Sequence, residues 1–367
     1  MKIFDSHIHL WDLKKLDLPW LQGRSSLKKD FLWKDLAQSY EGYELEGAVF
    51  VETDCADKLE EDIFVNEHFY TNCPKAAYVA GGILSKTMRL SPHAIGFREV
   101  LHNENSRDFK ELLKGLELLE DKGLIFELCA RPRDLLNIAK ELKSFPKLKV
   151  VLNHLGNVNE LKEPGSKELD KDFKAAIELL AQRELTWCKL SGLSDNLDKL
   201  AVLDFFSQTF SKYKLLYASN FPVNTLYQEQ KATLTYLLNY YEKDENIFSK
   251  NAKKLYKINP KQRFAQSINL HKDKIEEYVR LHAAPFEGVN KMIKNCGITS
   301  YEIYLKGSKL FAVFDYEGDD FDFDMQEMAK DEGTRFWWQH TDPCQYRLKG
   351  AGKDEWWSDL KLVYKLK

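Results

Sequence analysis

The sequence predicts a large α/β domain with a (β/α)8-type barrel, followed by a small α+β domain. Short β-rich runs alternate with amphipathic stretches over the first 258 or so residues, as in parallel βαβ units. About eight such repeats fit the roughly 250 residues of a (β/α)8 barrel. After Asn259-Pro260 the spacing of the expected strands and helices changes, which indicates a second domain.

Each repeat of the first block begins with an expected strand. These strands are Ile3–Leu10, Ala48–Thr53, Ala77–Ile83, Ile95–Val100, Leu124–Leu128, Lys149–Leu152, Thr186–Leu190 and Leu215–Ser219. Amphipathic stretches between them, such as Phe109–Glu120 and Leu135–Lys143, predict helices. Lys14–Lys34 has no clear periodicity and predicts a loop over the barrel mouth. Ile247–Tyr256 predicts a closing helix.

The Asn259-Pro260 pair predicts the domain boundary, because the residue before a proline disfavours the helical conformation. We therefore expect domains at residues 1–259 and 260–367. The second block predicts a strand at Arg263–Leu270, a helix at Lys272–Lys294, strands at Tyr301–Leu305 and Lys309–Asp315 joined by the three-residue turn Lys306-Gly307-Ser308, a helix at Phe321–His340 and a last strand at Leu360–Lys365. This βαββαβ order predicts a ferredoxin-like α+β domain.

Composition excludes several classes of partner. The 367 residues carry a formal net charge of −3 with both signs interspersed, so no nucleic-acid-binding face is expected. No apolar run approaches the roughly 20 residues that span a bilayer, so no membrane partner is expected. The N-terminal MKIFDSHIHLWD has charges where a signal peptide is apolar, and the six cysteines form no CxxC. Reduced thiols and a cytoplasmic location are therefore expected.

Polar residues stand at the carboxyl ends of the expected strands, where α/β barrels hold their catalytic groups. His7 and His9 are two positions apart, so on a strand they point to the same face. Two inward histidines are costly to bury for packing alone, which favours a functional role. The other strand-end residues are Glu52, Asp54, Arg98, Glu127, His154, Ser191 and Asn220. For a single Glu or Arg at such a position, a salt-bridged loop residue is the alternative.

The first block resembles the amidohydrolase superfamily, and within it the sugar-lactone and dicarboxylate-lactone hydrolases. The motifs that carry the resemblance occur in the family's order: DSHIHLWD at 5–12, PWL at 19–21, GFREVL at 96–101, NHLGNV at 153–158, KLSGL at 189–193, ASNFPV at 218–223 and NAKKLY at 251–256. The resemblance implies a distorted barrel that opens a lactone, with His7, His9, His154 and Arg98 at active-site positions. Arg98 would hold a polar or anionic group of the substrate, and His154 would polarise the lactone carbonyl.

The chain departs from the family's pattern at Asn153 and at Asn220, where the family has Asp. The Asp that Asn220 replaces is the superfamily's metal ligand and general base. An amide cannot take a proton from water at neutral pH, and it adds no negative charge to a metal site. The remaining candidate bases are His154, Glu52 and Glu127, and the last two are also candidate substrate contacts.

Two alternatives for the barrel therefore stay open. One divalent metal ion, Zn²⁺, would use His7 and His9 as ligands, and the family's lactonases differ in whether they need a metal. A catalytically silent barrel that serves as a scaffold is the second alternative.

The second block is rich in the residue types that sugar mutarotation needs. One group must protonate the ring oxygen, another must remove the anomeric proton, and a flat apolar wall must hold the sugar. Tyr278 and His282 lie four residues apart and share a helix face. Tyr301 and the Trp337-Trp338 pair add aromatic walls. An ordinary aromatic core is the alternative.

This block resembles the small L-rhamnose and L-fucose mutarotases over essentially all of Lys261–Lys367. Matching stretches are RFAQSINL at 263–270, EEYVRLH at 276–282, SYEIYLKGSKLFAVFDYEGDDFDFD at 300–324, RFWW at 335–338 and the end near 362–366. The KLF hairpin followed by DDFDFD is more similar to the fucose branch. The family has Trp-Pro-Glu where this chain has Phe286-Glu287-Gly288, so part of the pocket's wall differs.

By this resemblance His282 and Tyr278 are the acid/base residues, and Tyr301 and Trp337 contact the sugar, with Trp338 adjacent. The family needs no cofactor and is dimeric, which implies a possible homodimer. Both resemblances together imply an enzyme of L-fucose catabolism that hydrolyses L-fuconolactone, or a related aldonolactone, and interconverts the anomers of L-fucose. Small-molecule sugars and lactones are the expected partners. A mutarotase on a silent barrel and a decarboxylase-type relative are the alternatives.

Overall fold

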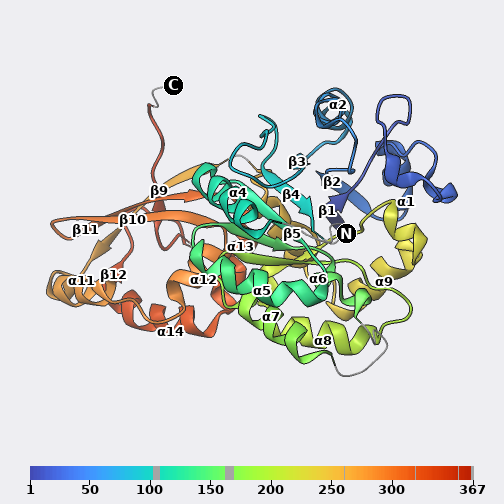
Figure 1. The fold of residues 1–367 in the computed structure, drawn as a ribbon. Helices are drawn as coiled ribbons and strands as arrows, with labels where there is room; N and C mark the ends of the chain where they lie inside the picture. The colour runs from blue at the N-terminus through green and yellow to red at the C-terminus, as the bar shows by residue number, and fades with distance from the viewer. Residues whose placement is uncertain (102–107, 162–168, 260, 319, 354, 365–367) are drawn as a thin grey trace. The chain divides into compact units, whose positions relative to one another are not determined.

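The computed structural model describes residues 1–101, 108–161, 169–259, 261–318, 320–353 and 355–364 (Figure 1). The chain forms two compact units, Met1–Ile258 and Asn259–Lys367. Separate folding of the two expected domains stays a prediction. In the described ranges no helix is long and apolar enough to cross a membrane.

The first unit contains one parallel sheet whose strands follow chain order from β1 to β8. They are β1 (Lys2–Ile8), β2 (Glu44–Val51), β3 (Ala76–Gly81), β4 (Gly96–Val100), β5 (Ile125–Cys129), β6 (Lys149–Leu152), β7 (Thr186–Leu190) and β8 (Leu215–Tyr217). Each overlaps the run predicted for it. Both faces of the sheet are buried, as apolar runs require: Phe50 contacts Phe64 and Phe69 in the following helices, whereas Val49 and Val51 join a second core cluster. The (β/α)8-type prediction is confirmed.

Hydrogen bonds between the ends of β1 and β8 nearly close the barrel. The His9 N–H donates to the Phe221 carbonyl at 2.7 Å, and the Asn220 N–H donates to the His7 carbonyl at 2.9 Å. The Asp5 carboxylate accepts a further bond from the Ser219 N–H at 2.9 Å. Because these bonds cross the seam, they hold both histidines beside Asn220.

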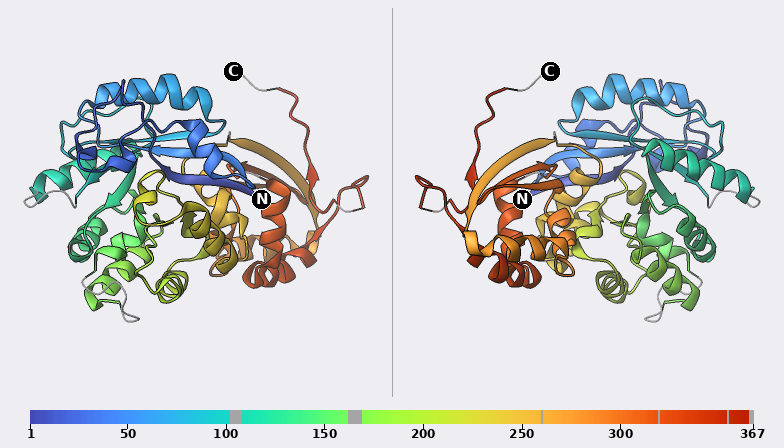
Figure 2. Two further views of the ribbon diagram at one scale, coloured as in Figure 1. Left: turned by 90° about the vertical axis from the view of Figure 1, so that its right-hand side faces the viewer. Right: turned by 90° about the vertical axis from the view of Figure 1, so that its left-hand side faces the viewer.

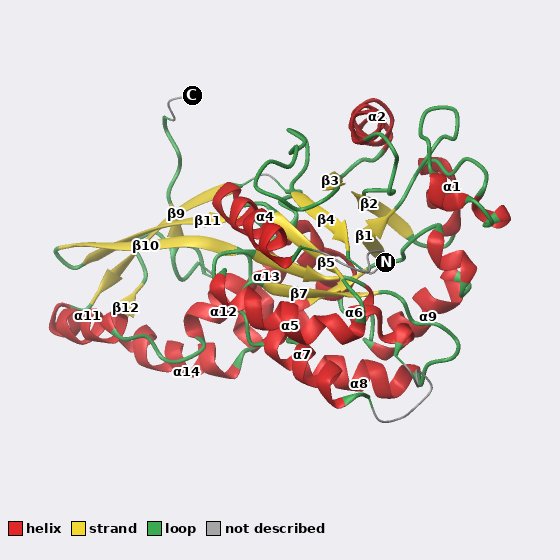
Figure 3. Cartoon of the chain, in the orientation of Figure 1, coloured by secondary structure: helices red, strands yellow, loops and turns green. Residues whose placement is uncertain are grey.

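Helices lie along the outside of the strands of this unit (Figure 2 and Figure 3). They are α1 (Trp33–Ser39), α2 (Lys58–Phe64), α3 (Tyr70–Asn72), α4 (Phe109–Lys122), α5 (Pro132–Glu141), α6 (His154–Asn157), α7 (Lys171–Ala181), α8 (Lys199–Thr209) and α9 (Gln230–Tyr240). The two amphipathic helices named from the sequence are α4 and α5. In α4 the buried residues Leu112, Leu116 and Leu119 form the apolar stripe that packs on the core.

The insert Lys14–Lys34 forms a loop with two short 3-10 turns, Pro19–Leu21 and Ser25–Leu27. The Trp20 indole N–H donates to the Thr53 carbonyl at 2.7 Å. This bond ties the insert to the residues that follow β2, at the carboxyl end of the barrel.

A π-helical turn at Asn246–Lys250 leads into α10 (Asn251–Leu255), where the sequence predicts the closing helix. The Lys253 ammonium lies 2.6 Å from the carboxylate of Glu46, which is also buried. Since Glu46 stands near the start of β2, this contact holds α10 across the amino-terminal end of the barrel.

The second unit is an antiparallel sheet with helices, in sheet order β10-β11-β9-β12, and β13 also pairs with β9. Its elements are β9 (Gln262–Leu270), α11 (Ile275–Ala283), α12 (Val289–Asn295), β10 (Ile298–Lys306), β11 (Lys309–Tyr316), α13 (Phe321–Lys330), α14 (Glu332–Thr341), β12 (Gln345–Tyr346) and β13 (Ser358–Asp359). This order confirms the ferredoxin-like prediction.

Two helices predicted as continuous are each broken in two. The helix predicted at 272–294 stops at Ala283 and restarts at Val289, because Pro285 lies in the gap and Gly288 adopts a φ of +88°. The helix predicted at 321–340 breaks at Asp331, whose carboxylate caps α14 by accepting from the Thr334 N–H at 2.7 Å.

Two predictions at strand ends are also wrong. Lys306 pairs with Lys309, so the hairpin turn has two residues, Gly307 and Ser308, and Gly307 adopts a φ of +63°. The last strand predicted at Leu360–Lys365 is absent from its described residues, 360–364, and pairing with β9 ends at Asp359. Side chains 362–364 are 73–90% exposed, so no sheet residue covers them.

Candidate active sites

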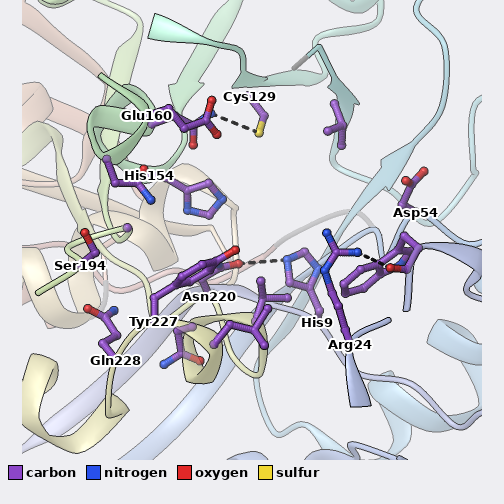
Figure 4. A pocket seen from close by; sticks show the side chains of 18 of the residues that line it. His9, Arg24, Asp54, Cys129, His154, Glu160, Ser194, Asn220, Tyr227 and Gln228 are labelled. Carbon is purple, nitrogen blue, oxygen red and sulfur yellow. Dashed lines mark hydrogen bonds between the residues drawn. The ribbon is translucent and has the colours of Figure 1, made fainter. Parts of the chain in front are cut away.

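A cavity of about 280 Å³ opens at the carboxyl ends of the barrel strands (Figure 4). Of the residues predicted from the sequence, His9, Arg98, His154, Asn220 and Asp54 line it. Trp20 and Arg24 also line it, as the predicted position of the insert over the barrel mouth requires. Sequence reasoning did not single out Glu160 or Asn224, which line it too.

His9 lies at the floor of this cavity, and His7 meets it from directly behind the floor. Their Nε2 atoms lie 3.1 Å apart, and His9 Nε2 lies 3.2 Å from Asn220 Oδ1. His9 Nδ1 lies 2.9 Å from the Val51 carbonyl oxygen, so this nitrogen donates. His7 does not line the cavity and is completely buried. Burial, followed by the Arg98 charge, lowers the pKa of His9 to about 4, so it is a neutral imidazole at pH 7.

Arg98 is held by Glu52 through three contacts. Its Nε donates to Glu52 Oε1 at 2.8 Å and its Nη2 donates to the Glu52 carbonyl at 2.9 Å, while Nη2 also lies 2.6 Å from Oε1. Lys58 lies 3.2 Å from the other carboxylate oxygen. Burial alone would raise the pKa of Glu52, but the Arg98 and Lys58 charges outweigh it and lower that pKa to about 2. Glu52 is therefore a counter-ion and a poor base, and it does not line the cavity.

Glu127 is likewise a counter-ion. Its Oε2 lies 2.6 Å from the Lys189 ammonium, both side chains are completely buried, and Glu127 also accepts a hydrogen bond from the Tyr256 hydroxyl. Glu127 does not line the cavity. Of the three bases named from the sequence, His154 alone reaches the cavity. Sequence reasoning quoted Lys189 only within a motif, although an inward polar residue on β7 was a signal.

His154 stands on a tight left-handed turn directly after β6. The φ angles of His154, Leu155, Gly156 and Asn157 are +51°, +50°, +69° and +55°, which is rare for residues with side chains. Such strain is concentrated at functional sites. His154 Nδ1 lies 2.8 Å from Ser191 Oγ, which fixes the orientation of the ring.

The donors at the cavity floor do not fit a divalent metal ion. They are the neutral imidazoles His7 and His9 and the neutral amide of Asn220, without a carboxylate. Two cations also face His7: Arg98 Nη1 lies 3.4 Å from its Nε2 and Lys189 Nζ lies 3.2 Å from its Nδ1. Because these two positive charges lie so close to His7, they would repel a metal ion bound there. Among the residues that the structure describes, no group of three or more His, Cys, Asp and Glu side chains is placed to hold a metal.

In the second unit, His282 lies between two aromatic rings. Its ring stacks on Tyr278 at a centroid distance of 4.1 Å and meets Trp337 edge to face at 5.0 Å. His282 Nδ1 lies 3.0 Å from the Tyr278 carbonyl oxygen, so Nδ1–H donates to it and Nε2 is left as the basic nitrogen. Burial lowers the pKa of His282, which favours the neutral form.

Of the other predicted residues of this unit, Tyr301 lies near the His282 cluster, whereas Trp338 makes no ring contact with it within the described part of the chain. Burial and the neighbouring Tyr301 raise the pKa of Tyr278. Tyr301 lies on β10 with its ring 5.4 Å from Phe314, and it is 41% exposed. Phe286, at the position where the mutarotase pattern differs, packs its ring 5.1 Å from Trp337. The wall is therefore rebuilt by a different aromatic residue.

Comparison with known proteins matches the two units separately. The sequence model of the family described as "Amidohydrolase" matches residues 4–258, and that of "L-rhamnose mutarotase" matches residues 263–366. Among solved structures, "Amidohydrolase 2" from Bifidobacterium longum subsp. infantis is 33% identical with a TM-score of 0.62, over 71% of this chain and 100% of that one.

Two further relatives are more distant or shorter. An amidohydrolase from Burkholderia multivorans, solved with bound Zn, is 20% identical with a TM-score of 0.57, over 70% of this chain and 100% of that one, and shows the fold alone. A UPF0734 protein of Dictyostelium discoideum is 30% identical over 110 residues, which are 28% of this chain and 88% of that one.

Proposed function

The chain belongs to the amidohydrolase family, and from this premise we propose that its barrel hydrolyses a neutral sugar lactone. The C-terminal L-rhamnose mutarotase domain interconverts the anomers of a 6-deoxy sugar. L-fucono-1,5-lactone and L-fucose are the proposed substrates. The observation that carries the barrel's role is that Arg98, His154 and His9 line one cavity, while the carboxylate of Glu52 is held by Arg98 and does not line it.

The cavity floor suits electrophilic activation of an ester. In hydrolysis, water adds to the lactone carbonyl carbon, the bond to the ring oxygen breaks, and that oxygen receives a proton. His154 polarises the carbonyl, and the Arg98 guanidinium stabilises the negative charge that develops on its oxygen. Because a lactone is an activated ester, this arrangement suffices for slow hydrolysis even though Asn220 cannot act as a base. No step needs a metal ion.

The charges around the cavity favour a neutral substrate. The Arg98 charge is balanced by Glu52, and the lining adds the carboxylates of Asp54 and Glu160 against one further cation, Arg24. Amide side chains make up much of the remaining polar lining: Asn157, Asn159, Asn220, Asn224 and Gln228. Amides pair well with hydroxyl groups, whereas a dicarboxylate would meet like charge.

Comparing the two lactone classes tests this assignment. Proton release measures the hydrolysis of L-fucono-1,5-lactone and of L-rhamnono-1,5-lactone. A lactone that carries two carboxylates is measured in parallel. We expect kcat/KM to be at least 100-fold higher for the neutral sugar lactones. A preference for the dicarboxylate would overturn the substrate class, although not the reaction class.

The mutarotase assignment is supported by the His282 cluster. The His282 imidazole is neutral and has a basic Nε2, and the buried Tyr278 lies one helical turn away. Together with the edge of the Trp337 indole, these groups supply the proton transfer and the apolar wall. Between the two reactions, oxidation of the sugar at C1 must supply the lactone. One chain would then serve both ends of that oxidation. No contact in the described residues favours the decarboxylase alternative.

A homodimer is also proposed, through the second unit. Tyr304 and Leu305 on β10 are 57% and 41% exposed, and Leu362, Val363 and Tyr364 beyond β13 are 73%, 90% and 75% exposed. Exposed apolar residues at an edge strand and beyond the last strand are surfaces that a second copy of the chain could cover. Light scattering coupled to gel filtration should give twice the 42.9 kDa chain mass, and deletion of residues 360–367 should shift it to one chain mass.

A further inference from the structure

A buried chain of polar contacts runs behind the cavity floor. Tyr256 donates to Glu127, Glu127 Oε2 lies 2.6 Å from Lys189 Nζ, and Lys189 Nζ lies 3.2 Å from His7 Nδ1. Glu127, Lys189 and His7 are all 0% exposed. The proposed hydrolysis makes no use of Lys189, although a buried ammonium is among the costliest groups to place inside a protein.

The contact with Lys189 decides which nitrogen of His7 carries a proton. An ammonium group has three donors and no acceptor, so His7 Nδ1 must be the acceptor in this hydrogen bond. A neutral His7 then carries its proton on Nε2. Lys189 and Arg98 already place two positive charges within 3.4 Å of the His7 ring, which favours the neutral form of His7.

The tautomer of His7 fits that of His9. His7 Nε2–H faces His9 Nε2 at 3.1 Å, and His9 Nε2 must be unprotonated because His9 Nδ1–H donates to the Val51 carbonyl. Every hydrogen in the row from Lys189 to Val51 therefore has an acceptor. In the opposite tautomer, His7 Nδ1–H would face the ammonium of Lys189, which leaves two donors 3.2 Å apart.

We propose that Lys189 is a positioning residue: it fixes His7 as the Nε2–H tautomer and makes His7 and His9 a donor–acceptor pair instead of two metal-binding nitrogens. A neutral imidazole binds a metal ion through its unprotonated nitrogen, and the nitrogen of His7 nearest His9 carries a hydrogen. The pairing also requires the Asn220 amide to turn its NH₂ group toward the His9 lone pair, because Oδ1, which lies 3.2 Å from His9 Nε2, is an acceptor like that nitrogen.

Arg98 is the competing donor to His7. Its Nη1 lies 3.4 Å from His7 Nε2, which would suit the opposite tautomer. However, this contact is longer than that of Lys189, and Nε and Nη2 of the same guanidinium are already bound by Glu52. The charge of Arg98 therefore acts beside His7 without fixing its tautomer.

Nitrogen NMR of the full chain tests the proposal directly. With ¹⁵N-labelled histidine, the signals of His7 are those lost in His7→Gln. We expect the shift of an unprotonated nitrogen at Nδ1 and of a protonated nitrogen at Nε2 at pH 7. A protonated Nδ1 in the wild-type protein overturns the proposal, whatever the variants do.

The double substitution Lys189→Met with Glu127→Gln tests the cause. It removes both charges, because Lys189→Met alone would leave the Glu127 carboxylate buried without a counter-ion. We expect His7 to change to a mixture of tautomers in the double variant. Lys189→Arg, which keeps a donor, should keep the wild-type pattern. An unchanged His7 tautomer in the double variant overturns the proposal.

Zinc affinity and kinetics give two further readouts. Zn²⁺ binding, measured by competition with a chromophoric chelator, should be at least tenfold tighter in the double variant than in Lys189→Arg. Only the kinetic readout rests on the proposed lactone hydrolysis: kcat should fall about 10–100-fold with a smaller change in KM, as for other residues that orient an active-site histidine. If His7 shows the expected tautomer but no lactone is hydrolysed, the proposed function fails and the role of Lys189 stands.

Discussion

The guanidinium of Arg98 is bound by both the side chain and the main chain of Glu52, at 2.8 Å to Oε1 and 2.9 Å to the carbonyl oxygen. Both residues are buried, and the pair lies beside the two histidines of the cavity floor. A planar group held at two points keeps one orientation, so its charge points to a fixed place in the cavity.

Arg98→Lys should therefore impair lactone hydrolysis. Lysine keeps the charge but not the two-point attachment, so the charge loses its fixed position opposite the carbonyl oxygen. We expect kcat/KM to fall about 10²–10³-fold, the loss typical of one oxyanion-stabilising donor. Glu52→Gln is the matched control, since it keeps the main-chain contact and should lose less. Equal activity of Arg98→Lys and wild type would exclude this role.

Asn220→Asp should create a better metal site. The substitution places a carboxylate about where Asn220 Oδ1 lies, 3.2 Å from His9 Nε2, and adds both a ligand charge and a general base. We expect tighter Zn²⁺ binding and faster lactone hydrolysis in the presence of zinc. Asn224→Asp adds the same charge elsewhere in the same cavity and is the control. If both variants bind zinc alike, the effect is one of net charge and not of geometry.

His282→Ala should abolish most of the accelerated exchange between sugar anomers. General acid–base transfer contributes roughly 10²–10⁴-fold, and His282 supplies the basic nitrogen between Tyr278 and Trp337. Saturation-transfer NMR on the anomeric protons of L-fucose measures the rate. His340→Ala removes an exposed histidine that packs on Phe286 outside this cluster, and it should retain most of the activity. Wild-type exchange by His282→Ala would refute the assignment.

The barrel should lose stability on acidification. His9 has a folded-state pKa of about 4, against roughly 6.5 when unfolded, so below pH 6.5 the unfolded chain binds a proton that the folded chain does not. Stability from this residue is complete above pH 6.5 and falls by about 3 kcal/mol as the pH decreases to 4. Denaturant unfolding between pH 4 and 8 measures the slope.

His9→Gln is the control for this pH dependence. Burial and the Glu52 charge raise the pKa of Glu61 to about 7, so its contribution has the opposite sign and increases as the pH falls. The difference between wild type and His9→Gln removes that contribution. If the two proteins have the same slope between pH 6.5 and 4, the His9 pKa is not depressed.

The strands of the barrel could be predicted from the sequence because both faces of each strand are buried, which leaves a continuous apolar run such as Ala48 to Val51. The breaks at Pro285 and Asp331 were missed because a helical apolar pattern continues on both sides of them. The exposed segment 360–364 reads as a strand because it is mostly apolar, and its pattern does not reveal that bonding to β9 ends with the Leu360 N–H, which donates to the Ala265 carbonyl at 2.7 Å.

Residue type and position predicted which side chains lie near the cavity, but not which of them line it. Glu52 and His154 follow strands and Glu127 lies within β5, yet only His154 lines the cavity, because Arg98 and Lys189 bind the two carboxylates. These ion pairs join different strands, so they depend on the inward direction of each side chain in the closed barrel. Local sequence does not specify that direction, and the role of Lys189 was missed for the same reason.

Hydrolysis of L-fucono-1,5-lactone by the full-length His282→Ala protein tests the central claim most directly. This background removes any contribution from the second unit, and proton release gives the rate. The sample is divided into chelator-treated and zinc-supplemented halves. The proposed function predicts slow hydrolysis above the buffer rate in both halves, since the donors at the cavity floor do not form a metal site. Hydrolysis no faster than buffer in either half, or hydrolysis only with zinc, would contradict it.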